Sequence, residues 1–128
     1  MINFFLVFIG GACGSVARYW ASQSINSFFV NKFFLGTVVV NVFGSFLIGI
    51  LYILASEQVK AISHSTKLLL ITGFLGGFTT FSAFSLDFFK LVEAGQIMVA
   101  ILYVLFSVWL SLLAVFAGFY LAKFGLYE

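Results

Sequence analysis

Four long apolar segments occupy most of this 128-residue chain, at residues 2–21, 34–55, 68–91 and 97–123. A helix that crosses a bilayer needs roughly 20 mostly apolar residues, and each segment is long enough. The chain is 63% hydrophobic and 8% charged, which leaves little sequence for a soluble domain. We therefore expect one all-α domain, residues 1–128, with four transmembrane helices. We expect the first segment to be retained, because it lacks the basic start of a signal peptide.

The third apolar segment contains an interruption between Gly73 and Ser85, which reads Gly-Phe-Leu-Gly-Gly-Phe-Thr-Thr-Phe-Ser-Ala-Phe-Ser. The chain has no proline, so a helix break here depends on Gly, Ser and Thr. Non-helical backbone at membrane depth is tolerated only where it is buried in protein or lines a watery cavity. Discontinuous helices of this kind often form ion or substrate sites. The sequence therefore predicts a broken third helix beside a buried ion site.

Polar side chains recur on one face of the second segment and on one face of the fourth. Each set is spaced at i, i+4 and i+8, and the two sets are Thr37, Asn41 and Ser45, and Tyr103, Ser107 and Ser111. The Asn41 carboxamide needs partners for its oxygen and its NH₂ group, so it can serve as an interhelical bond or as part of a pathway. A stripe of hydroxyl donors suits an anion, although single serines often bond to their own helix.

The few charged and reactive residues exclude several kinds of chemistry. We expect Asp87 to form an exposed ion pair with Lys90, and Arg18 to be either an anchor at the membrane surface or a positive entrance to an anion path. We expect His64 to be solvated and Cys13 to be a small packing residue beside glycines. No pairing of a nucleophile with a base, phosphate-binding loop or metal-ligand spacing is present, so we expect no enzyme.

Basic residues are balanced across the predicted membrane. The face with both termini carries Lys60, Lys67 and Lys123, and the opposite face carries Arg18, Lys32 and Lys90. The positive-inside rule orients a protein through an imbalance of Lys and Arg, and here the count is three against three. This balance permits insertion in both orientations and an antiparallel dimer. The alternative is a single orientation set by charges near the first helix or by lipids.

Three motifs give the chain a family resemblance. Residues 11–19, 36–41 and 73–85 resemble the first-helix, second-helix and broken third-helix motifs of the Fluc (CrcB) fluoride channels. The order, the spacing and the overall length all match, so the resemblance covers nearly the whole chain.

The resemblance implies an antiparallel, dual-topology homodimer with two fluoride pores and a central sodium ion that is structural and not transported. It implies that backbone carbonyls of Gly76 and Thr79 hold the sodium, and that Phe81 and Phe84 line the pores. The other residues that it places along or near the fluoride pathway are Asn41, Thr37, Thr80, Tyr103, Ser107, Ser111 and Arg18.

On this basis we expect a passive channel in the cell (inner) membrane that exports cytoplasmic fluoride and reduces its toxicity. One rival is a small drug/proton antiporter, which needs a membrane-buried carboxylate, and the first segment has no acid. Another is a non-conducting assembly subunit, which the two polar stripes argue against.

Overall fold

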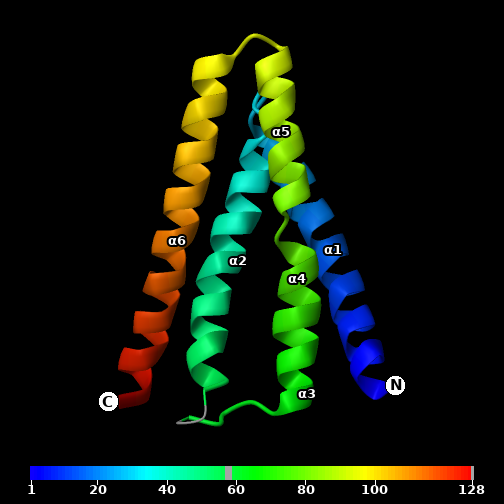
Figure 1. Ribbon diagram of the computed structural model, residues 1–128, viewed down its shortest axis with the longest axis vertical. Coiled ribbons are helices and arrows are strands. Elements are labelled where there is room, and N and C mark those ends of the chain that lie inside the picture. Colours follow the sequence, from blue (N-terminus) through cyan, green and yellow to red (C-terminus); the bar gives the residue numbers. More distant parts are fainter. Residues whose placement is uncertain (57–58, 128) are drawn as a thin grey trace.

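The computed structural model describes residues 1–56 and 59–127, and this part of the chain is an all-α bundle. Helix α1 (Ile2–Phe28) and helix α2 (Leu35–Leu54) are followed by a composite third segment and by helix α6 (Ile97–Tyr127). The four segments run alternately up and down, so both termini lie at the same end of the bundle (Figure 1). Each is long and apolar enough to span a membrane, which confirms the four predicted spans.

The third segment is built from several pieces, as the sequence predicts. It begins with α3 (His64–Lys67) and continues through a π-helix, η1 (Leu68–Leu75), and the short α4 (Gly76–Phe78). The backbone is then extended at Thr79 and Thr80, with ψ angles of 154° and 123°, before α5 (Phe81–Glu93) begins. Thr80 caps α5 by accepting a hydrogen bond from Ala83 N–H at 3.1 Å. The predicted break therefore lies at two consecutive threonines.

Two helices extend further than the apolar segments from which they are predicted. Helix α1 continues to Phe28, beyond the expected end at residue 21, and α6 continues to Tyr127, beyond residue 123. Hydropathy marks the part of a helix that sits in hydrocarbon, whereas the helix itself continues as long as its backbone hydrogen bonds are made.

Glycines allow the helices to approach closely at two contacts. Helix α1 packs against η1 and α4, and α2 packs along α6. A Cβ atom on Gly14 would overlap the carbonyl oxygen of Phe74, and one on Gly118 would overlap the carbonyl oxygen of Phe46. Small residues at such positions permit backbone-to-backbone packing of membrane helices.

Two sequence-based expectations are wrong. Asp87 does not lie in an exposed ion pair, because α5 turns it towards α2, where it is 8% exposed and accepts a hydrogen bond from Thr37. Lys90 is exposed instead, and its ammonium nitrogen lies 5.7 Å from the centre of the Phe33 ring. Cys13 is exposed rather than packed, because the buried face of α1 carries Gly10 and Gly14.

Candidate functional site

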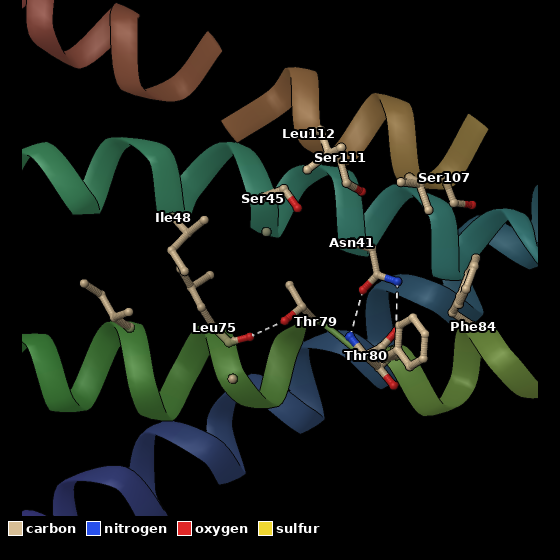
Figure 2. Close-up of a pocket in the computed structure, with 15 residues that line it drawn as sticks. Asn41, Ser45, Ile48, Leu75, Thr79, Thr80, Phe84, Ser107, Ser111 and Leu112 are labelled. Atoms are coloured by element: carbon tan, nitrogen blue, oxygen red, sulfur yellow. Dashed lines mark hydrogen bonds between the residues drawn. The ribbon is translucent and has the colours of Figure 1, made fainter. Parts of the chain in front are cut away.

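A groove of about 610 Å³ lies between α2, the third segment and α6. Its wall is largely apolar, and its polar groups come from all three segments (Figure 2). The lining residues are Asn41, Gly44, Ser45 and Ile48 from α2, Ile71, Leu75, Gly76, Thr79, Thr80, Phe81 and Phe84 from the third segment, and Ser107, Val108, Ser111 and Leu112 from α6.

The groove brings most of the predicted site residues together. Those that line it are Asn41, Gly76, Thr79, Thr80, Phe81, Phe84, Ser107 and Ser111. Ser45, which belongs to the α2 stripe but was not among the predicted site residues, also lines it. Thr37, Tyr103 and Arg18 lie outside the lining.

Asn41 joins α2 to the helix break. Its Oδ1 atom accepts a hydrogen bond from Thr80 N–H at 2.7 Å, and its Nδ2 atom donates to the Thr80 carbonyl at 2.9 Å (Figure 2). Both halves of the carboxamide are therefore used between helices. Asn41 is an interhelical bond that also lines the groove.

The break frees the Gly76 and Thr79 carbonyl groups, among others, from their regular helical donors. In a continuous helix Thr80 N–H would donate to the Gly76 carbonyl, and Ala83 N–H would donate to the Thr79 carbonyl. Here Thr80 N–H donates to Asn41, and Ala83 N–H donates to the Thr80 side chain. The Gly76 and Thr79 carbonyls, predicted as cation ligands, are therefore oxygens that can bind a hard cation.

Arg18 lies inside the first span and holds the same break from the other side. Its Nε atom donates to the Gly77 carbonyl at 3.1 Å, so its side chain runs towards α4. The sequence leaves open whether Arg18 is a surface anchor or an entrance to an anion path, and the structure adds a contact between Arg18 and the break.

A row of aromatic rings runs from the groove into the core. The Phe81 and Phe84 ring centres are 5.3 Å apart, and the Phe84 and Tyr103 ring centres are 5.1 Å apart. Phe34 packs on Tyr103 at 5.3 Å. Phe81 is 78% exposed, whereas Phe84 and Tyr103 are 9% and 3% exposed. The two phenylalanines therefore differ sharply: one projects from the bundle and the other is part of its core.

Two hydroxyl groups on α6 are buried, at Tyr103 and Ser107, which are 3% and 5% exposed. The Tyr103 hydroxyl lies beside Asp87 and Thr37. The Ser107 hydroxyl lines the groove and makes no hydrogen bond within the described residues. An unsatisfied polar group in an apolar interior is costly, so the Ser107 hydroxyl favours a ligand that accepts hydrogen bonds.

Thr37 and Asp87 form a buried polar pair beside this row. Thr37 Oγ1 donates to Asp87 Oδ2 at 2.6 Å, and the two residues are 7% and 8% exposed. The sequence analysis missed Asp87 as a site residue. The available signal was its helical spacing, because Phe84, Asp87 and Leu91 share the buried face of α5.

This fold and groove define a multi-pass membrane protein whose helices enclose a partly polar, aromatic-lined groove. The model of the family described as "CrcB-like protein, Camphor Resistance (CrcB)" matches residues 5–119. The chain belongs to this family. The matched stretch contains every predicted site residue, from Arg18 to Ser111.

Curated relatives match over nearly their whole length. A "Fluoride-specific ion channel FluC" of Rhizobium etli is 50% identical over 118 residues, which is 92% of this chain and 94% of the relative. A protein of the same name from Agrobacterium fabrum is 46% identical over 123 residues, which is 96% of this chain and 98% of the relative. Another from Coxiella burnetii is 43% identical over 117 residues, which is 91% of this chain and 94% of the relative. The relatives are named as ion channels and not as enzymes.

Proposed function

We propose that this protein is a fluoride-specific ion channel that exports cytoplasmic fluoride passively and so reduces fluoride toxicity. The observation that carries the proposal is the buried, unpartnered hydroxyl of Ser107 in the aromatic groove. The names of the curated relatives supply the identity of the anion.

The groove offers two kinds of positive partner for an anion. The hydroxyls of Tyr103, Ser107 and Ser111 follow one another at one-turn spacing on α6, and the two that line the groove, Ser107 and Ser111, can donate to fluoride there. Aromatic rings carry a positive edge, so Phe81 and Phe84 can present ring edges to the same ion. A narrow path with closely placed donors favours the smallest halide.

The direction of flux follows from the chemistry of fluoride and from the membrane potential. Fluoride enters cells as neutral HF, which dissociates at cytoplasmic pH and leaves the anion trapped inside. An inside-negative potential drives an anion outwards by roughly 2.3 kcal/mol per charge per 100 mV. A passive, selective path in the cell membrane is therefore sufficient for export.

A homodimer would complete the groove. Phe81 is 78% exposed on the single chain, and a Cβ built on Gly76 meets only one atom, at 4.0 Å. A second copy would cover both positions, as would be expected for an antiparallel, dual-topology arrangement. The basic residues are Lys60, Lys67 and Lys123 towards one face and Arg18, Lys32 and Lys90 towards the other, and this balance leaves both orientations accessible.

The freed carbonyls of Gly76 and Thr79 suit a structural sodium ion. No cluster of three or more His, Cys, Asp or Glu side chains that could hold a metal occurs within the described residues, so a cation at the break would depend on carbonyl oxygens. The ion would neutralise carbonyl dipoles at a point where two subunits meet. We expect a higher melting temperature in sodium than in an equal concentration of N-methyl-D-glucamine.

The antiporter remains the second candidate because of one observation. Asp87 is a buried carboxylate within a span, and proton-coupled export of a cation needs such a group. Its hydrogen bond with Thr37 gives it a structural partner, which favours the channel. Transport of a lipophilic cation driven by a pH gradient would support the rival.

The deciding experiment is anion efflux from proteoliposomes loaded with fluoride or chloride, started with a potassium ionophore and read with ion-selective electrodes. Rapid fluoride release with negligible chloride release supports the proposal. The Ser107→Ala variant should release fluoride more slowly, whereas Ser65→Ala, on the exposed short helix α3, is the matched control and should not differ from wild type. No fluoride release from folded protein would overturn the proposal.

A further inference from the structure

Asn26 closes the turn that connects α1 to α2. Its Nδ2 atom donates to the Phe33 carbonyl at 2.7 Å, and its Oδ1 atom accepts from Gly36 N–H at 2.8 Å. Phe33 lies in the connection between the two helices, and Gly36 is the second residue of α2. One carboxamide therefore sets both the path of the turn and the point at which α2 begins.

The start of α2 is pressed against α1 at the same place. A Cβ atom on Gly36 would lie 2.6 Å from the carbonyl oxygen of Ser22 and 2.9 Å from Asn26 Oδ1. Such distances are too short for a side chain, so only glycine allows this approach. The contact leaves the first turn of α2 little freedom to rotate while Asn26 holds it.

Two residues at the start of α2 depend on this turn, because each contacts a buried residue of another helix. Phe34 packs edge-on against Tyr103, with ring centres 5.3 Å apart and planes at 65°. Thr37 follows Gly36 directly and donates to Asp87 at 2.6 Å. The position of the Tyr103 ring and the Thr37–Asp87 pair therefore both depend on where this turn lies.

We propose that Asn26 is a positioning residue for the anion path: by holding the turn at residues 33–36, it fixes Phe34 against Tyr103 and Thr37 against Asp87. Asn26 does not line the groove, so it acts through these residues and not on the ion. The inference rests on the proposed channel function for its effect on flux. Its structural part, the placement of Tyr103, stands independently of that function.

The test compares Asn26→Ala with Gln23→Ala, an exposed position one turn earlier on α1. Both are measured for fluoride efflux and, after labelling with 3-fluorotyrosine, by ¹⁹F NMR, with the Tyr103 signal assigned from a Tyr103→Phe sample. Asn26→Asp serves as a second variant, because its carboxylate still accepts from Gly36 N–H while the donor to Phe33 is lost.

We expect Asn26→Ala to reduce fluoride efflux several-fold and to shift the Tyr103 signal, while the signals of Tyr52 and Tyr120 stay in place. Asn26→Asp should fall between Asn26→Ala and wild type, and Gln23→Ala should match wild type. A shift of all tyrosine signals would mean a general loss of structure and would overturn the inference. So would an Asn26→Ala variant that matches Gln23→Ala in both measurements. Absence of efflux in wild type would instead overturn the proposed function, and the Tyr103 signal would still test the positioning.

Discussion

Asn41 and Thr80 are joined by two hydrogen bonds at the break in the third segment. Asn41 Oδ1 accepts from Thr80 N–H at 2.7 Å, while Asn41 Nδ2 donates to the Thr80 carbonyl at 2.9 Å. A side chain of α2 thus gives Thr80 N–H the acceptor that the Gly76 carbonyl would supply in a continuous helix. The same bonds draw the start of α5, with Phe81 and Phe84, to the wall of the groove.

Asn41→Asp should abolish most fluoride flux. The carboxylate can still accept from Thr80 N–H, but it cannot donate to the Thr80 carbonyl, and its charge would repel both that carbonyl and a passing anion. Asn41→Ala removes both bonds, and leaving buried polar groups unpaired costs about 1–3 kcal/mol each. Efflux from proteoliposomes and melting temperature in detergent measure the two effects. Asn3→Asp, at an exposed position near the start of α1, is the control and should behave as wild type.

Phe81→Ile and Phe84→Ile should separate conduction from packing. Phe81 is 78% exposed, so its replacement should lower fluoride flux with little change in the melting temperature of the isolated subunit. Phe84 is 9% exposed and packs on Tyr103, so its replacement should lower both. Phe106→Ile, on the exposed surface of α6 outside the groove, is the matched control. Normal flux in both Phe81→Ile and Asn41→Asp would show that the pathway residues are wrongly assigned.

Thr37→Val should destabilise the protein through its effect on Asp87. The substitution conserves shape but removes the donor that binds the buried carboxylate, which costs roughly 1–3 kcal/mol. Thr37→Ser keeps a hydroxyl at the same place and should recover most of the loss. Thermal unfolding in detergent gives the comparison, and fluoride efflux on the same samples reports whether the pair also affects flux. Equal melting temperatures for the valine and serine variants would contradict the role assigned to this hydrogen bond.

The four spans and the break in the third segment could be predicted from the sequence, because each depends on residues that are neighbours in the chain. Apolar runs longer than the bilayer core specify the four spans, and the run of glycine and threonine around Gly76–Thr80 specifies the break. The groove could be predicted in part. Polar residues at one-turn spacing lie on one face of α2 and on one face of α6, and Asn41, Ser107 and Ser111 from these faces do line the groove.

Contacts between distant segments could not be predicted in the same way. In a soluble helix the apolar face identifies the buried side, but these spans are apolar on most of their surface, so outside the polar stripes the sequence gives weak information on which face meets which helix. For that reason the Thr37–Asp87 pair, the Arg18–Gly77 contact and the Asn26 clamp emerged only from the structure. The π-helical winding of η1 (Leu68–Leu75) likewise has no clear signal in its sequence.

Gly14→Ala tests the close packing on which the position of the break depends. A methyl group at residue 14 would overlap the carbonyl oxygen of Phe74, which is backbone and cannot move aside without displacing η1 from α1. Overpacking of this kind costs typically about 1–3 kcal/mol, and here it would also strain the Arg18 bond to Gly77.

Gly11→Ala is the matched control for this substitution, since its Cβ atom would lie 3.9 Å from the Gly73 carbonyl oxygen, an ordinary contact. Size-exclusion chromatography and melting temperature in detergent should show a less stable Gly14→Ala protein with reduced fluoride flux, and a Gly11→Ala protein close to wild type. If both variants elute, melt and conduct alike, the α1–η1 contact does not determine where the break lies. A loss confined to Gly14→Ala would tie the groove to the backbone packing of α1, because neither glycine lines it.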